Sequence, residues 1–500
     1  MNKIKPLPEE WSGLLNSEQK EAIENIQGPL LIIAGAGSGK TRVLTYRYAH
    51  LIKTYGINFE NILAITFTNK AANEMKERIS QLLNLELSPK WISTFHSLCV
   101  KMLRIHGHHI GFNNNFTIYD QSDSTKLIRN CMKDSDIDTK QYSPKRIQAH
   151  ISSLKNQRIL PGEAIEFAQS FFDVKVAEVY SSYQKKLMLA NSMDFDDLLV
   201  KAVELLETSD KSLDYWSSKF KYIMIDEYQD TNMVQYRLVE LLASKYKNIC
   251  VVGDSDQSIY AFRGADIRNI QEFENDFRNA KVISLEKNYR SSQKILDIAN
   301  AVISNNPRNK EKKLWTENEV GLDVNLIEFN SERDESKWIA DEINKLLNQN
   351  EYREIAIFDK TNNQARLFEE ELRKLSLNYK VVGNVRFYDR KEIKDIISYL
   401  NFLINPEDTI SFERILNVPK RGIGESTLQK LRDYSNTNEI SLSESINNLS
   451  KISNLSERAK KQIINFQEII NELKTFALQG PSITITTVSY THLTLPTKRI

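Results

Sequence analysis

The sequence predicts an α/β fold built around a parallel sheet. Short apolar runs recur along the chain, and stretches with helical periodicity separate them. In addition, a glycine-rich turn follows the first run directly, as expected where a buried strand leads into a helix. The apolar runs are LLIIA at 30–34, ILAITF at 62–67, YIMIDE at 222–227, ICVVGD at 249–254 and KVISLE at 281–286.

Two helical blocks interrupt this alternation. Residues 111–193 are polar and helical, with one apolar stripe that we expect to pack as core: Val176, Val179, Tyr180, Tyr183 and Leu187. A second α/β segment has strand-like runs at 323–329, 355–360 and 379–383, and the chain turns helical again after about residue 387. The predicted boundaries are 1–110 and 194–282 for the two parts of the first α/β domain, 111–193 for its helical insertion, 283–386 for the N-terminal part of the second α/β domain, 387–487 for a second, partial helical domain and 488–500 for a non-native tail.

Composition limits the class of protein and of partner. A chain of 500 residues can hold several domains, and 41% hydrophobic with 27% charged residues is typical of a soluble globular protein. Because the net charge is only +1, any nucleic-acid binding must come from local patches. Cys99, Cys131 and Cys250 are far apart and are expected to be reduced thiols in the core. The sequence shows neither a signal-peptide core nor a membrane-length apolar stretch, so it predicts a cytoplasmic protein without a membrane partner.

The glycine-rich turn fits a phosphate-binding loop. Its glycines let backbone N–H groups point at phosphate oxygens, and the following helix N-terminus adds partial positive charge. Lys40 is expected to reach the β/γ-phosphates and the Thr41 hydroxyl to hold Mg²⁺. An ordinary turn before a helix is the alternative, and the strand–loop–helix context disfavours it. The loop residues are Ala34, Gly35, Ala36, Gly37, Ser38, Gly39, Lys40 and Thr41.

Two acidic residues follow the apolar run at 222–225. Asp226 is expected to bind Mg²⁺ through its outer shell, and Glu227 to polarise the attacking water, which requires a carboxylate within hydrogen-bond reach. A solvated acidic strand end is the alternative. The phosphate-binding loop upstream favours the catalytic interpretation.

Two later strand ends carry further candidate groups. In VVGDSDQSIYAFRGAD at 251–266, Gln257 could sense the γ-phosphate. Tyr260, Phe262 and Arg263 suit base stacking on single-stranded nucleic acid, worth roughly 1–3 kcal/mol per base, although such residues more often form core. In SLEKNYRSS at 284–292, Arg290 could stabilise transition-state charge on the γ-phosphate.

This ordered set resembles the superfamily I DNA helicases of the UvrD/Rep/PcrA type over residues 8 to about 480. The resemblance implies two RecA-like P-loop motor domains, each with a helical accessory insertion, the second motor domain being incomplete. It also implies ATP and Mg²⁺ as cofactors, single-stranded DNA and single/double-strand junctions as partners, and 3′→5′ movement coupled to duplex unwinding.

The resemblance assigns further residues by motif. LNSEQKEAI at 15–23 and GSGKTRVLTYR at 37–47 place Gln19 and Arg42 at the adenine, and NYRS at 288–291 places Tyr289 there as a stacking ring. PKRGIGESTLQKL at 419–431 resembles an element that touches duplex backbone through Gly422 and Gly424. The residues implied at single-stranded DNA, besides Tyr260, Phe262 and Arg263, are Phe67, Thr68, Asn69, Thr94, Phe95, His96 and Phe195.

The chain departs from the family pattern in three places. Phe262 stands where the family usually has Trp, and Asp359-Lys360 stands where Tyr-Arg is usual. Two motifs that the family carries after its second accessory domain, one with a second arginine for the γ-phosphate, do not appear. The tail at 488–500 begins with ten residues that correspond, under one choice of codons, to a transposon-end sequencing adapter. We therefore expect a C-terminally truncated fragment that is inactive or weakly active.

Three functions remain open at this point. An ATP-dependent DNA helicase leads, and an ATP- and DNA-binding module without sustained ATPase is the alternative. A P-loop kinase or GTPase ranks below both, because no guanine-selecting Asn-Lys-x-Asp follows and the aromatic loop would be idle. The motifs do not distinguish repair, plasmid replication and recombination.

Overall fold

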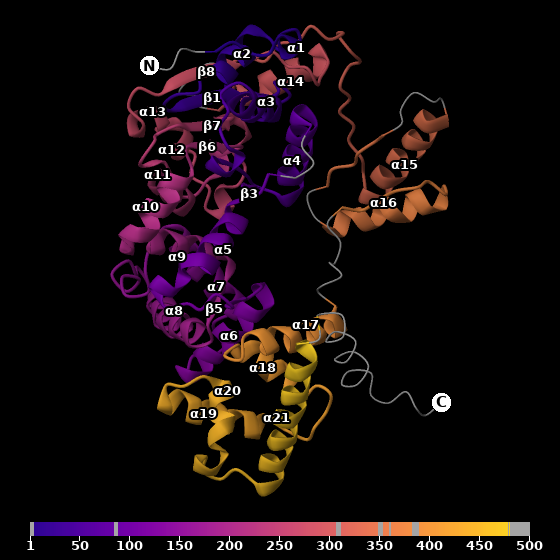
Figure 1. Ribbon diagram of the computed structural model, residues 1–500. Coiled ribbons are helices and arrows are strands. Elements are labelled where there is room, and N and C mark those ends of the chain that lie inside the picture. The colour runs from indigo at the N-terminus through magenta and orange to yellow at the C-terminus, as the bar shows by residue number, and fades with distance from the viewer. Residues whose placement is uncertain are drawn as a thin grey trace. The chain divides into compact units, whose positions relative to one another are not determined.

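The computed structural model describes residues 5–84, 89–306, 312–348, 354–359, 362–382, 390–478 and 480 (Figure 1). The predicted tail at 488–500, Lys360 and the predicted boundary at 386/387 lie outside these residues. The chain divides into two compact units, residues 1–321 with 396–500, and residues 322–395. Within the described ranges, no helix is both long and apolar enough to cross a membrane.

A six-stranded parallel sheet forms the centre of the first unit, which confirms the predicted fold class. The strand order is β3-β2-β6-β7-β1-β8. Successive residues of β1 alternate between two cores, because Leu31 packs on one face of the sheet while Leu30 and Ile32 pack on the other. The strands are β1 Leu30–Ala34, β2 Ile62–Thr66, β3 Ile92–Thr94, β6 Tyr222–Ile225, β7 Ile249–Gly253 and β8 Lys281–Leu285.

The last strand of this sheet, β8, spans the predicted boundary at 282/283 and pairs with β1 from Leu30↔Lys281 to Ala34↔Leu285. Helices cover both faces of the sheet (Figure 1). All three cysteines are buried, as predicted for core thiols. The helices of this part are α1 Glu9–Ser12, α2 Ser17–Glu24, α3 Lys40–Lys53, α4 Asn69–Leu83, α5 Phe95–His106, α9 Phe195–Thr208, α10 Asp210–Lys219, α11 Met233–Ala243, α12 Arg268–Gln271, α13 Phe273–Asp276 and α14 Gln293–Ile303, with short 3₁₀ turns at Phe59–Asn61, Gly107–Ile110, Tyr228–Asp230, Ser255–Gln257 and Ala261–Arg263.

The helical insertion consists of α6 Gln121–Asp134, α7 Pro144–Asn156 and α8 Phe171–Leu189. A short parallel pair, β4 Thr117–Ile118 with β5 Ser192–Met193, closes its base. The predicted apolar stripe lies on α8, and all five of its side chains are buried in the insertion core. The C-terminal helices have a core of their own. They are α17 Lys391–Ile404, α18 Thr409–Ile415, α19 Glu425–Asn438, α20 Leu442–Ser445 and α21 Glu457–Ala477, with a 3₁₀ segment at Ile446–Lys451.

The second unit differs from its sequence prediction. Its described residues include the helices α15 Glu332–Asn348 and α16 Asn362–Lys374 and the first residues of α17. Where the runs expected as strands are described, at 322–329, 354–359 and 377–381, they have no regular secondary structure. Their apolar side chains, such as Leu326 and Phe358, are exposed. An apolar run becomes a strand only when a neighbour completes its hydrogen bonds, and the described part of this unit supplies none.

Candidate nucleotide site and nucleic-acid surface

A cavity of about 330 Å³ lies where β6, β7, β1 and β8 end. These four strands are neighbours and parallel, so the residues after each of them meet at one edge of the sheet. The cavity collects most of the predicted nucleotide residues and adds Arg78 of α4, which the sequence did not single out. It is lined by Ala36, Gly37, Gly39, Lys40, Thr41, Arg78, Glu227, Gln257, Tyr289 and Arg290.

The segment after β8 holds the phosphate-binding loop closely. Asn288 Nδ2 donates to the Ala36 carbonyl at 2.6 Å, and the Tyr289 amide donates to the Gly37 carbonyl at 3.0 Å. A Cβ on Gly37 would lie 2.5 Å from Asn288 Nδ2, and its φ is +68°, so only glycine fits there. Asn288 is 2% exposed and was not predicted; its own side chain also accepts from the Arg290 amide at 2.8 Å.

The residues assigned to the adenine lie beside this loop. Gln19 Nε2 donates to the Ser38 carbonyl at 3.0 Å, and Asn16 Nδ2 donates to the Tyr289 hydroxyl at 3.0 Å. Arg42 stands over the Tyr46 ring at 5.8 Å from its centroid. Their contact with a base stays a prediction.

Charged groups at the mouth of the cavity pair with one another. Lys40 Nζ lies 2.9 Å from Glu227 Oε2, and Gln229 Nε2 donates to the same oxygen at 3.0 Å. Glu227 has a left-handed backbone, with φ +50°. Burial, and then the Glu227 charge, raise the pKa of Asp226 to about 7, although Lys40 opposes the shift. A cation beside Asp226 would relieve this unfavourable burial, and the Thr41 hydroxyl in the adjoining cavity adds an oxygen donor of the kind Mg²⁺ prefers.

A second cluster of charged residues lies next to Gln257. Gln257 Nε2 donates to Asp254 Oδ2 at 2.6 Å. Lys312 forms an ion pair with Asp254 and another with Asp256, the latter at 3.1 Å. Two residues later, Leu314 packs so closely on Gly35 that a Cβ there would lie 2.1 Å from it. The segment at 312–314 was not predicted from the sequence, because these contacts join parts of the chain that are distant in sequence.

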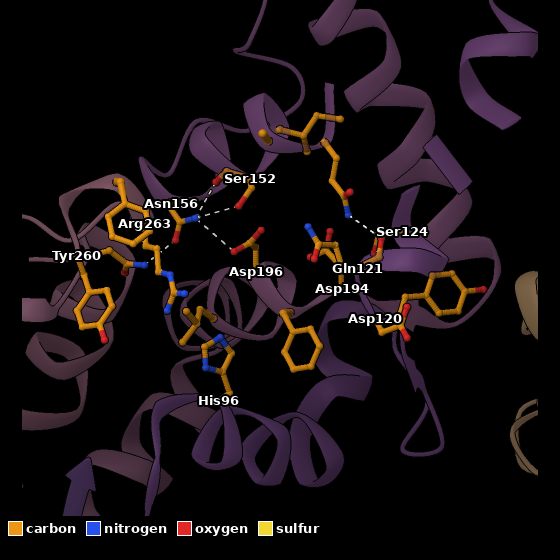
Figure 2. Close-up of a pocket in the computed structure, with 18 of the residues that line it drawn as sticks. His96, Asp120, Gln121, Ser124, Ser152, Asn156, Asp194, Asp196, Tyr260 and Arg263 are labelled. Carbon is orange, nitrogen blue, oxygen red and sulfur yellow. Dashed lines mark hydrogen bonds between the residues drawn. The ribbon is translucent and has the colours of Figure 1, made fainter. Parts of the chain in front are cut away.

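A larger groove of about 630 Å³ lies between the sheet domain and the helical insertion (Figure 2). Two of its aromatic side chains are unusually exposed, since Phe262 keeps 78% and Phe195 53% of its surface open. Arg263 lies over the rings of Tyr260 and Phe262, at 5.2 and 5.4 Å from their centroids. The predicted DNA residues on this groove are Phe67, Thr68, His96, Phe195, Tyr260, Phe262 and Arg263.

Other residues assigned to DNA have different surroundings. Thr94 caps α5 through a hydrogen bond from the Ser97 amide, and Phe95 is buried against Phe67, with ring centroids 5.7 Å apart. Asn69 is exposed at the start of α4. The two glycines assigned to duplex backbone, Gly422 and Gly424, are exposed in the C-terminal helical block, and a Cβ on either would meet open space.

A buried ionic network supports the groove from the side of the insertion. Lys155 of α7 pairs with Asp194 at 2.7 Å and with Asp197 at 2.8 Å. Burial opposes the charge on Lys155, but the two carboxylates raise its pKa overall. Burial, and then the Asp194 charge, raise the pKa of Asp197 to about 6. Tyr183 also donates to Asp194, at 2.8 Å, so this network fixes α7 and α8 against the start of α9.

Comparison with known proteins agrees with this geometry. Residues 15–278 match the model of the UvrD/REP helicase N-terminal domain, and residues 283–488 match that of the UvrD-like helicase C-terminal domain. Proteins named ATP-dependent DNA helicase PcrA from Staphylococcus aureus and Staphylococcus epidermidis are 47% and 48% identical to the chain over 460 residues. Each alignment covers 92% of the chain and 63% of the relative, so the chain spans less than two thirds of those proteins. The chain belongs to the UvrD/REP helicase family.

Proposed function

We propose that the chain carries the ATP-driven motor of a DNA helicase, which moves 3′→5′ on single-stranded DNA and couples ATP hydrolysis to duplex unwinding. One observation carries the proposal: five predicted catalytic side chains line one cavity, and an exposed aromatic groove lies in the same compact unit. The five are Lys40, Thr41, Glu227, Gln257 and Arg290.

ATP binds at the phosphate loop in this proposal. Lys40 and the backbone amides before it hold the β- and γ-phosphates, and Thr41 with Asp226 would hold Mg²⁺. Bound Mg²⁺ would supply positive charge that offsets the charge developing on the phosphates. Arg290 and Gln257 face the same cavity and would contact the γ-phosphate.

The Lys40–Glu227 ion pair has a consequence for the reaction. A phosphate that takes Lys40 as its partner must displace Glu227, whose carboxylate is then free to accept a proton from the attacking water. The ion pair would therefore keep the base occupied until a nucleotide arrives.

Single-stranded DNA binds along the aromatic groove in this proposal. Stacking on Phe195, Tyr260 and Phe262 tolerates any base, because every base offers a π-face. The 3′→5′ direction rests on the family resemblance. Binding at a single/double-strand junction would use the backbone of Gly422 and Gly424, where nothing blocks the approach of a phosphate.

ATP hydrolysis and strand displacement test the proposal together. We expect a single-stranded oligonucleotide to accelerate hydrolysis, and a duplex with a 3′ tail to be separated in preference to one with a 5′ tail. Hydrolysis that no oligonucleotide stimulates would contradict the motor assignment. Preference for the 5′ tail would contradict the direction only.

The same assay decides the alternative of a binding module without sustained ATPase. The relatives, which are named as helicases, do not favour that alternative. The observation in its favour is that, among the described residues, the apolar segments at 322–329 and 354–359 belong to no strand, since a motor needs a rigid second domain. Binding of both ligands without turnover would support it.

A further inference from the structure

Asn156, the last residue of α7, connects the helical insertion to the loops of the sheet domain. Its Nδ2 donates within the helix to the Ser152 carbonyl at 2.8 Å and across the groove to Asp196 Oδ1 at 3.3 Å. Its Oδ1 accepts from Asn232 Nδ2 at 2.6 Å. Figure 2 shows Asn156 between Asp196 and the pair Tyr260 and Arg263. Two hydrogen bonds of this side chain, to Asp196 and from Asn232, therefore join it to residues outside α7.

Asn232 and the aromatic loop form one connected group with Asn156. Asn232 caps α11 and follows Thr231 directly. The Asp266 amide and Asn269 Nδ2 both donate to the Thr231 carbonyl, at 2.9 Å each, which fastens the end of the loop. Gly264, with φ +85°, lies so close that a Cβ on it would be 3.3 Å from Asn156 Cβ.

The same segment leads back to the nucleotide cavity. Gln229 donates to Glu227 at 3.0 Å and accepts from the Asp254 amide at 2.9 Å. Two residues separate Gln229 from Asn232, and one of them, Thr231, is fully buried. A shift of Glu227 on nucleotide binding would thus change the position of Asn232, which bonds to Asn156.

We propose that Asn156 is a positioning residue, which holds the aromatic loop at 260–264 against the start of α11 in the orientation that receives nucleic acid. The inference rests on the proposed function of the groove. Nothing in the family matches assigns a role to this residue. Neighbouring Gln157 is exposed, and its side chain donates to Ser153 of the same helix turn, so it provides a matched control.

Three variants test the inference. Asn156→Ala removes both cross-groove bonds. Asn232→Ser removes only the donor to Asn156, while serine keeps the helix cap. Gln157→Ala is the control. Hydrogen–deuterium exchange of the ligand-free proteins is measured over residues 260–266, whose amides bond within the loop and to Thr231. Affinity for a fluorescent single-stranded oligonucleotide and basal ATP-analogue affinity are measured in parallel.

We expect faster exchange over 260–266 and about 3- to 10-fold weaker oligonucleotide binding in Asn156→Ala and Asn232→Ser, with parental analogue affinity. The double variant should lose no more than Asn156→Ala alone, because Asn232→Ser breaks a bond that Asn156→Ala already removes. Parental exchange in both variants would overturn the inference, whatever the oligonucleotide does. Faster exchange with unchanged binding, in a parent that binds, would also overturn it. A parent that binds no oligonucleotide, with exchange still faster in the variants, would refute the proposed function and keep the structural role of Asn156.

Discussion

The nucleotide cavity and the aromatic groove lie in the same unit but are built from opposite chemistry. In the cavity, Lys40 already pairs with Glu227, and next to the cavity residue Gln257, Lys312 pairs with Asp254. In the groove, the aromatic faces are open to solvent, and Phe262 is the most exposed of them.

This difference predicts how each site responds to mutation. A cavity of paired charges depends on each member, because removing one leaves another unpaired at a partly buried site. Stacking surfaces contribute in smaller and more independent steps. Variants in the cavity should therefore have large effects on nucleotide chemistry, and variants in the groove moderate effects on oligonucleotide affinity.

The largest effect is expected for Lys40→Ala. Loss of the ammonium removes the charge that compensates the phosphates, so productive ATP binding should be abolished. A fluorescent ATP analogue, titrated with and without Mg²⁺, measures this. Lys53→Ala is the control, because Lys53 is exposed at the other end of α3. Parental affinity with the same Mg²⁺ dependence would show that the phosphate assignment is wrong.

Glu227→Gln should keep nucleotide binding and lose turnover by about 10²–10⁴-fold, the usual contribution of a general base. The amide preserves shape and can still accept from Lys40. Single-turnover hydrolysis with excess protein gives the rate, and the ATP analogue gives the affinity. Hydrolysis at the parental rate would exclude Glu227 as the base.

Asp226→Asn should change the pH dependence of stability in nucleotide-free protein. The folded-state pKa of Asp226 is raised from 3.8 to about 7, so the native state holds an extra proton between these values and loses stability as the pH rises through them. The cost at high pH is at most on the order of 4 kcal/mol. In urea unfolding, the free energy of unfolding of Asp226→Asn should increase relative to that of the parent as the pH rises from about 4 to about 7. A constant difference would contradict the raised pKa.

Phe262→Ala should weaken single-stranded oligonucleotide binding by roughly 1–3 kcal/mol, with little dependence on base sequence. Phe171→Ala is a matched control, since Phe171 is an exposed phenylalanine on α8, 68% open against 78% for Phe262. Fluorescence anisotropy with homopolymeric and mixed oligonucleotides measures the change. Equal affinities of parent and variant would remove Phe262 from the binding surface.

The sequence predicted five of the six strands of the first sheet and most members of the nucleotide cavity because their signals are local, whereas the three-residue strand β3 and Arg78 were not predicted. Apolar runs mark the strands, and catalytic side chains follow each run directly, as Asp226 follows β6. Parallel strands bring those ends together without further information. The second unit could not be predicted in this way, because the run at 323–329 specifies an extended chain but not the neighbour that would pair with it.

Residues that organise the sites were missed for a related reason. Asn288, Lys312 and Asn156 act through contacts across 58 to 252 positions of sequence, and an isolated Asn or Lys carries no periodic signal. The resemblance to known helicases assigned Phe95 to DNA, whereas the structure buries it in the core. The motif located the segment that contains Phe95, but packing against the core determines where its side chain points.

The most direct test of two distinct sites is a crossed binding measurement. An ATP analogue and a single-stranded oligonucleotide are each titrated into the parent, Lys40→Ala and Phe262→Ala. We expect Lys40→Ala to lose its affinity for the analogue and to bind the oligonucleotide as the parent does. We expect Phe262→Ala to keep its affinity for the analogue and to bind the oligonucleotide more weakly. If each variant lost both ligands to the same extent, or neither lost its own, the assignment of the cavity to ATP and of the groove to DNA would be wrong.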